Sequence, residues 1–411
     1  MSKPPVDARP ITHLKHGAPL VLFVPDSDLE ALKAFHFIVK RTYRWAPDDQ
    51  AQPSAWQRAF VMGDRHFEDG GPYDASLAEE TELGPPKPGT DVFVHGNVYA
   101  PGGEATYCRP AIRIGNERRE LIATGDRFAT IRPGGRVEMT PASKFTVLPL
   151  RYELAYGGVD RMHPFGPIPC PSNPLGAGFV VSPMDGEAPR NRWTPLPNLE
   201  DPARMLTVDD FFVPGDAIQK ARPAAGFGPV PRHWEPRASL AGMPASAKPF
   251  WNLLHGAETE MGQGFREMQP SFWQAAAQGY AFPRLEGHEK IELKHLWSKA
   301  EEVSFRLPVT RPKLRAGFND GALSDVRLSL ATVSIDVELH EVVLQWRGTL
   351  PTPDTLRTLE ALKRLPLELD GELTLPAPLL GTGFPIDLLA GEQMGMDLLD
   401  LKGLPLPGGP R

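Results

Sequence analysis

The stretch from Phe145 to Arg237 constrains the fold more than any other part of this 411-residue chain. Five phrases rich in Gly and Pro follow one another within about 90 residues, and such phrases interrupt regular helices. They also carry aromatic and Leu side chains, which a flexible linker would lack. The segment therefore predicts ordered loops packed on a core.

Composition extends this argument to the whole chain. The sequence contains 46 Pro and 39 Gly, which is about a fifth of the residues and well above the usual roughly 12%. Because these residues break helices and central strands, we expect short strands with long connections. The predicted fold class is mainly β (β-rich α+β), with antiparallel sandwich- or barrel-like sheets, long Gly/Pro-rich loops and a few short helices.

Apolar runs and turn signals place the first strands. A hairpin is expected at Gly115-Asn116, and Gly96 is expected to mark a bulge. The predicted strands cover residues 20–24, 34–39 with an extension over 41–45, 90–99, 111–114 and 120–123.

The clearest signal lies at Thr332–His340, where apolar and polar residues alternate strictly. This alternation predicts a half-buried antiparallel strand, with Val333, Ile335, Val337 and Leu339 on its buried face. Residues 342–348 are expected to be its hairpin partner or a bent continuation of it. Further strands are predicted at residues 290–294 and 303–307, a short helix at 271–278, a helix capped by Thr352, and a small hairpin turning at Asp370-Gly371.

These elements divide the chain into five regions. The division comprises a disordered lead (1–10), an N-terminal β unit (11–144), a loop-rich middle region packed on the β units (145–285), C-terminal antiparallel strands (286–350), and a helix, small hairpin and apolar Pro/Gly-rich tail (351–411).

Charge and cysteine content argue against several classes of function. The net charge of −7 disfavours a general nucleic-acid or anionic-membrane surface. Cys108 and Cys170 are far apart and form no CxxC, so neither a disulfide framework nor a zinc site is indicated. Without an apolar signal-peptide core or a run of transmembrane length, we expect a cytoplasmic protein.

Motifs that carry chemistry are not evident in the sequence. No HExxH, GxSxG or GK[ST] occurs, so we expect no catalytic residue, cofactor or metal. Three acidic residues leave a carboxylate-dependent hydrolase of carbohydrate or peptide substrates open, namely Glu153, Glu200 and Asp201. Their Pro- and Asn-containing context favours structural turns instead.

Aromatic residues in Pro/Gly context are the remaining candidates for function. Aromatic side chains on rigid loops make good anchors for protein partners, although they also fill the core beneath such loops. The candidate partner-binding residues are Phe211, Phe212, Phe227, Trp234 and Trp251.

Several phrases of the sequence resemble, in order and wording, the bacterial domain-of-unknown-function family 2169. They include K-P-G-T-D-V-F-V-H-G-N-V-Y-A-P-G-G (87–103), T-G-D-R-F (124–128), L-P-L-R-Y-E-L-A-Y-G-G (148–158), N-P-L-G-A-G-F (173–179), L-P-N-L-E-D-P (196–202), A-G-F-G-P-V (225–230), W-E-P-R (234–237), L-E-G-H-E-K-I-E-L (285–293) and L-Q-W-R-G (344–348). The resemblance covers residues 20–350.

Members of this family look like adaptors or chaperones of type VI secretion. The resemblance therefore implies a non-enzymatic protein that binds and stabilises a toxic effector and helps load it onto the secretion spike. It implies an effector and a spike protein as partners, and neither nucleic acid nor membrane. The alternatives are the hydrolase named above and a structural component of the spike.

Overall fold

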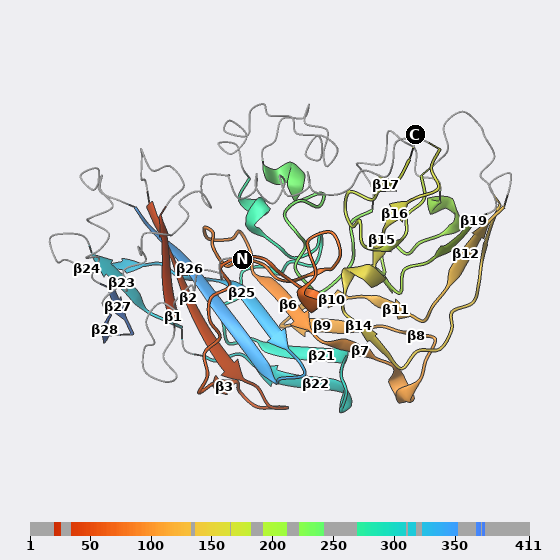
Figure 1. The fold of residues 1–411 in the computed structure, drawn as a ribbon. Coiled ribbons are helices and arrows are strands. Elements are labelled where there is room, and N and C mark those ends of the chain that lie inside the picture. Colours follow the sequence, from red (N-terminus) through yellow and green to blue (C-terminus); the bar gives the residue numbers. More distant parts are fainter. Residues whose placement is uncertain are drawn as a thin grey trace, which may run out of the picture.

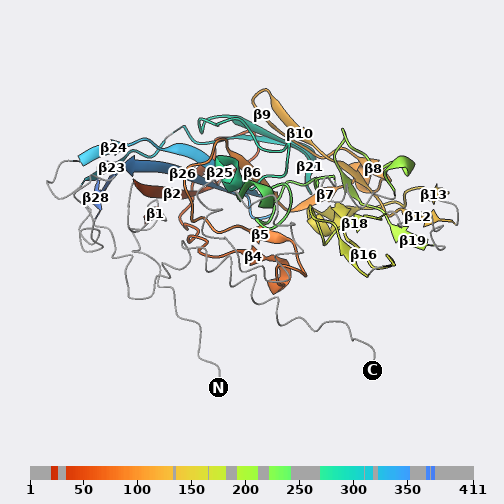
Figure 2. The ribbon, with the colours of Figure 1, turned by 90° about the horizontal axis from the view of Figure 1, so that it is seen from above.

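The computed structural model of the chain is an elongated, strand-rich molecule (Figures 1 and 2). It describes residues 20–25, 34–132, 136–164, 166–181, 192–211, 222–241, 269–309, 311–317, 323–351, 367–370 and 372–374. Helical structure in these ranges is limited to short 3-10 turns, so the mainly β prediction is confirmed.

The largest sheet joins strands from the first hundred or so residues with strands from residues 329–351. Its order is β1 (Leu20–Pro25), β2 (Ala34–Arg44), β26 (Glu341–Pro351), β25 (Ser329–Asp336) and β6 (Asp91–His95), with β3 (Gln52–Pro53) paired to β2. Neighbours are antiparallel except β25 and β6, which are parallel. Segments that the sequence assigns to separate regions thus share one sheet.

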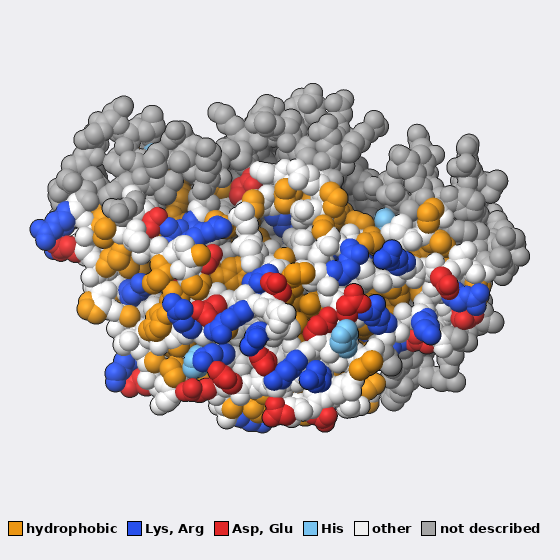
Figure 3. All heavy atoms as spheres, turned by 180° about the vertical axis from the view of Figure 1, so that it is seen from behind, with side chains coloured by type: hydrophobic (Ala, Val, Ile, Leu, Met, Phe, Trp, Pro, Cys, Tyr) orange, Lys and Arg blue, Asp and Glu red, His pale blue; other side chains and the backbone are white. Residues whose placement is uncertain are grey.

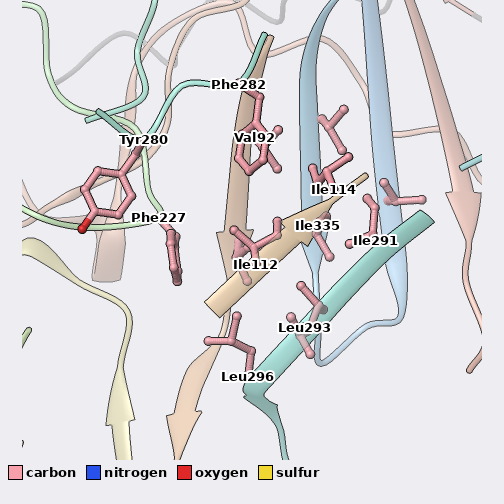
Figure 4. Close-up of a cluster of buried hydrophobic side chains, with 14 of the residues drawn as sticks. Val92, Ile112, Ile114, Phe227, Tyr280, Phe282, Ile291, Leu293, Leu296 and Ile335 are labelled. Carbon is pink, nitrogen blue, oxygen red and sulfur yellow. The ribbon is translucent and has the colours of Figure 1, made fainter. Parts of the chain in front are cut away.

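A second sheet packs against one face of the first. It consists of β10 (Glu117–Glu120), β9 (Ala111–Ile114), β21 (Lys290–Trp297) and β22 (Ala300–Arg306). Figure 4 shows Val92 and Ile335 of the first sheet beside Ile112, Ile291 and Leu293 of the second. These side chains are buried, so the alternating apolar residues of both sheets form the main core of a sandwich.

Smaller sheets extend the molecule at both ends (Figure 1). A second core lies under β12 and β19 and includes Ala129, Ile131 and Phe179. The sheets are β13 (Val137–Met139), β12 (Phe128–Ile131) and β19 (Arg192–Pro195); β20 (Leu199–Glu200), β11 (Ile122–Thr124) and β8 (Tyr107–Cys108); β24 (Leu323–Val326), β23 (Leu314–Gly317), β27 (Leu367–Leu369) and β28 (Glu372–Thr374); β14 (Val147–Pro149) with β7 (Asn97–Tyr99); β15 (Tyr156–Gly157) with β18 (Ala177–Gly178); β16 (Val159–Asp160) with β17 (Ile168–Pro169); and β4 (Arg65–His66) with β5 (Leu77–Glu79).

Single 3-10 turns punctuate the connections between these strands. They are η2 (Phe67–Asp69), η3 (Pro101–Gly103), η4 (Tyr152–Leu154), η6 (Val208–Asp210), η8 (Ala238–Ala241) and η10 (Pro270–Trp273).

The Gly-rich phrases of the middle region pack tightly on one another. The buried Asn173 amide donates to the backbone oxygens of Tyr152 (2.7 Å) and Tyr156 (3.0 Å). A Cβ on Gly157 would lie 2.1 Å from the backbone oxygen of Asn173, and Gly157 has φ of +150°. Only glycine fits this close approach, which explains why Y-G-G and N-P-L-G occur in one ordered unit.

Most predicted strands are confirmed. β1 matches 20–24, and β2 covers 34–39 together with its expected extension. β21, β22 and β26 match the strands predicted near residues 290, 303 and 342. β27 and β28 form the small hairpin at Asp370. The helix predicted after Thr352 lies outside the described residues.

Two strand predictions were wrong in detail. The strand expected over 90–99 breaks at Gly96, which has φ of +149°, and its halves β6 and β7 enter different sheets. The Gly115-Asn116 hairpin is present, but its second strand is β10. β10 ends at Glu120, and residues 122–124 form β11 in another sheet.

Competing hydrogen bonds explain two further corrections. The helix expected over 271–278 stops after one turn, because the backbone N–H groups of Ala275 and Ala276 donate to the Asp91 carboxylate. The strand expected over 332–340 ends at Asp336, whose carboxylate accepts from the backbone N–H of Leu339. Leu339 is consequently 52% exposed rather than buried.

Replacing Leu344 by Ala should strongly destabilise the protein, whereas replacing Leu339 by Ala should not. Leu344 is fully buried in the central strand β26, so the cavity left by Leu344→Ala should cost about 2–5 kcal/mol. The exposed Leu339 should cost less than about 0.5 kcal/mol. Urea unfolding of the two variants measures both values, and equal costs would contradict the described end of β25.

Candidate functional site

A row of polar side chains crosses the largest sheet on the face opposite the main core. Lys40, Gln345, Thr332 and Asp91 are register partners on β2, β26, β25 and β6. Paired residues of neighbouring strands point to the same face, so the four side chains form a line. Lys40, Gln345 and Asp91 are buried, and Thr332 is partly buried. A charged row removed from water requires partners.

The segment between β3 and β6 covers this row and supplies those partners. Lys40 Nζ lies 2.6 Å from Glu82 Oε1 and donates to the backbone oxygen of Ala59. Lys87 Nζ lies 2.6 Å from Asp91 Oδ2. The buried charges of the sheet are therefore neutralised mostly by residues of the covering segment.

A cavity of about 280 Å³ remains between the sheet and the covering segment. Ser334, Gln345 and Arg347 of the sheet line it, together with Glu80 and Lys87 of the covering segment. The cavity opens to solvent on one side, and its wall is rich in ionisable side chains. This cavity is the candidate functional site of the described structure.

A serine and a histidine form a hydrogen-bonded pair in the cavity wall. His95 Nε2 lies 2.9 Å from Ser334 Oγ. Burial lowers the pKa of His95, and the nearby charges of Glu79 and Asp336 offset part of this effect. A neutral imidazole beside a hydroxyl is the first requirement of a nucleophile and its base. Among the described residues, however, His95 makes no hydrogen bond to a third group that would orient it, as a triad requires.

A second ionic cluster holds the middle region against the covering segment. The Glu80 carboxylate accepts from Arg237 and lies 3.0 Å from Arg232 Nε. Burial alone would raise the pKa of Glu80, but Arg237, Arg232 and Lys87 outweigh burial and lower this pKa to about 2. Glu80 therefore stays ionised at every physiological pH and holds Trp234-Glu235-Pro236-Arg237 against the covering segment.

Three of the five candidate partner-binding residues lie inside the protein. Phe211, Phe227 and Trp234 are buried, and Trp234 packs edge-on against Tyr152 at 5.6 Å between ring centroids. Phe212 and Trp251 lie outside the described residues. The three buried residues fill the core beneath the Gly/Pro-rich loops, and they present no surface to a partner. Partner binding through Phe212 and Trp251 stays a prediction.

The acidic residues considered for hydrolysis are engaged in structural contacts. Glu153 accepts from the backbone N–H of Ser76 at 2.7 Å and from its hydroxyl. Glu200 pairs with Arg127 and accepts from the backbone N–H of Leu206 at 2.6 Å. Asp201 accepts from the backbone N–H of Ala203 at 2.9 Å, which is the geometry of an Asx turn.

An aromatic pair with one exposed member, which sequence reasoning missed, lies at one end of the molecule. Trp193 on β19 is 61% exposed, and its ring stacks on Phe128 of β12 at 4.1 Å between centroids. Figure 1 places β12 and β19 at the end remote from β23 and β24. The available signal was the four-residue run Arg192-Trp193-Thr194-Pro195, which is too short to show which face is buried.

One face of the molecule carries interspersed charges. Figure 3 shows Lys/Arg and Asp/Glu side chains intermixed over the face seen from behind. Exposed pairs on the second sheet include Lys290 with Glu292 at 2.7 Å and Lys294 with Glu302 at 2.9 Å. Such a surface is typical of a face that contacts water.

Metal-binding and membrane-spanning features were sought within the described ranges. There, no group of three or more His, Cys, Asp or Glu residues is arranged to hold a metal ion. The helices of those ranges include none with the length and apolarity needed to cross a membrane. Cys108 and Cys170 are both buried free thiols.

The fold and cavity define a β-rich protein with a covered polar sheet. The model of a bacterial family described as "Uncharacterized protein conserved in bacteria (DUF2169)" matches residues 31–347, and the chain belongs to this family. No curated protein and no solved structure matches the chain.

Acid should destabilise the protein between about pH 6.5 and pH 4, partly through His233. Burial, together with the charges of His66 and Arg237, lowers the pKa of His233 to about 4. Between these two pH values the unfolded chain binds a proton that the folded chain does not. The free energy of unfolding therefore decreases as the pH is lowered through this range. One such proton contributes up to about 1.4 kcal/mol per pH unit.

Urea unfolding at several pH values tests this contribution. His233→Gln should flatten the pH dependence in that range, whereas replacing the exposed His288 by Gln should leave it unchanged. An identical slope in wild type and His233→Gln would refute the assignment.

Proposed function

We propose that this protein is a non-enzymatic adaptor and chaperone, which binds and stabilises a type VI secretion effector and helps load it onto the secretion spike. The observation that carries the proposal is the exposed Trp193, which stacks on the partly buried Phe128 of the β12–β19 sheet. The nature of the client rests on the resemblance of the sequence phrases to a family whose members look like such adaptors.

The aromatic stack has the properties of a protein-binding anchor. Trp is enriched among residues that dominate binding energy at interfaces. The inward side chains of the same sheet, Ala129 and Ile131, are fully buried, so the sheet holds the stack in place. A small rigid anchor among interspersed charges suits a client that must later be released, because large apolar interfaces are typical of permanent complexes.

A hydrolase is the second candidate function, because Ser334 and His95 lie in hydrogen-bond contact within a cavity. The engagement of Glu153, Glu200 and Asp201 in turns and ion pairs speaks against the carboxylate mechanism. A structural role in the spike would require the protein to leave the producing cell, whereas an adaptor stays behind.

Co-expression with a candidate effector encoded beside the gene of this protein tests the proposal. The effector should be more soluble and better secreted when this protein is present, and this protein should remain in the cell. Unchanged effector solubility and secretion in its absence would reject the adaptor function. Ester or peptide hydrolysis that disappears in Ser334→Ala would establish the hydrolase instead.

Trp193→Ala should weaken effector binding by at least tenfold without changing stability. Loss of a central aromatic anchor typically costs 2 kcal/mol or more of binding free energy, and an exposed side chain contributes little to folding. Calorimetric titration measures the affinity, and Leu339→Ala provides an exposed apolar control on another part of the surface. Equal affinities for the Trp193→Ala and Leu339→Ala variants would place the interface elsewhere.

A further inference from the structure

Arg347 differs from the other basic side chains in the cavity wall. Lys40, Arg58 and Lys87 each have a carboxylate oxygen within 4.0 Å. Arg347 is 3% exposed and has no such carboxylate among the described residues. It is therefore a buried cation without a directly paired anion.

Neutral acceptors surround the Arg347 guanidinium. Its Nε donates to Gln345 Oε1 at 3.0 Å, and its terminal nitrogens donate to the backbone oxygens of Pro85 (3.0 Å) and Glu82 (2.9 Å). A guanidinium has five N–H donors. The three hydrogen bonds above use three of them, so two N–H groups of Arg347, a residue of the cavity wall, remain for a further partner.

The nearest carboxylates are already engaged with other cations. Glu80 pairs with Arg237 and Arg232, Glu82 pairs with Lys40, and Asp91 pairs with Lys87. Burial lowers the pKa of Arg347 to about 10, an effect that Glu80, Glu82 and Asp91 partly offset at longer range. Arg347 thus keeps its positive charge at neutral pH, and the charge lacks a counter-ion of its own.

The other walls of the cavity restrict what could supply that counter-ion. The hydroxyls of Thr332 and Ser334 also line the cavity, where they already contact Gln345 and His95. The remaining carboxylates of the wall belong to Glu79, Asp336 and Glu341, and each of them pairs with Arg65 or Arg58. The volume of about 280 Å³ lies just below the roughly 300–1,000 Å³ of pockets for drug-sized ligands. A planar anion of a few atoms fits both the space and the fork-like geometry of a guanidinium.

We propose that the cavity binds a small monoanionic carboxylate, with Arg347 as the residue that pairs with it. The ligand is either a free small carboxylate or the terminal carboxylate of a peptide inserted into the cavity. This site is independent of the Trp193–Phe128 surface and does not rest on the proposed function.

Sodium acetate is the first probe, titrated against sodium chloride at constant ionic strength. Wild-type protein labelled with ¹⁵N-arginine should show a saturable shift of the Arg347 Nε–H signal with acetate, and none with chloride. The signal is assigned by its absence in Arg347→Lys. An Arg347 signal that stays unshifted at high acetate concentration would overturn the proposal. The titration itself uses wild-type protein, and the Arg347→Lys variant serves only to assign the signal.

Gln345→Glu provides the sharper test. Gln345 already accepts from Arg347, and the nearly isosteric Glu would place a carboxylate beside the guanidinium. Acetate affinity should fall at least tenfold, and the thermal midpoint without acetate should not fall. The same change at the exposed Gln52 on β3, Gln52→Glu, should leave affinity unchanged. Undiminished acetate affinity in Gln345→Glu would contradict pairing with Arg347.

Two peptide arms distinguish the sources of the carboxylate. A short Ala/Gly peptide with a free C-terminus and the same peptide with a C-terminal amide are titrated separately. Binding of the acid but not the amide, in competition with acetate, identifies a terminal carboxylate as a ligand. Binding of acetate but neither peptide identifies a free small carboxylate. Binding of both peptides with equal affinity would count against carboxylate recognition.

Discussion

The central constraint on this structure is that charges buried on one face of the largest sheet must be compensated, either by an opposite charge or by hydrogen bonds. Removing a charged side chain from water is costly unless an opposite charge or several hydrogen bonds compensate. Lys40 and Asp91 meet this requirement through Glu82 and Lys87 of the covering segment. The covering segment is thus held in place by ionic contacts, and its conformation determines the cavity, whose wall includes Arg347.

The Gly- and Pro-rich phrases solve a different problem, because they bring backbone close to backbone. Tyr152 shows how the phrases depend on one another: its hydroxyl donates to the backbone oxygen of Gly228 at 2.7 Å, and a Cβ on Gly226 would lie 2.6 Å from its ring. Phrases whose contacting residues, Tyr152 and Gly228, lie 76 positions apart in the sequence are therefore parts of one packing arrangement. Stability, rather than chemistry, accounts for their residue types.

The sequence predicted local structure well where a strict alternation was present. Val333 and Ile335 lie in the core as expected, since period-two alternation identifies which residues share a face. Alternation does not reveal what covers the other face. The alternation predicts that Ser334 and Asp336 face solvent. The covering segment instead lies over this face of the sheet, and the cavity lies between the sheet and the segment. Such coverage depends on contacts between residues far apart in the chain.

The candidate surface was harder to find than the fold for a related reason. Trp234 and Trp193 both stand in short segments that contain Pro. Trp234 is nevertheless buried in the main core, whereas Trp193 is exposed on β19. Which tryptophan faces outward depends on strand pairing between β12 and β19, and the short strand gives no local signal of it.

Site-specific photocrosslinking tests the central functional claim most directly. Benzoylphenylalanine placed at position 193, in cells that produce the candidate effector used for co-expression, should crosslink to that effector. Crosslinking to the effector from position 339 but not from position 193 would contradict the account, because it would show that the aromatic stack is not the surface that holds the client.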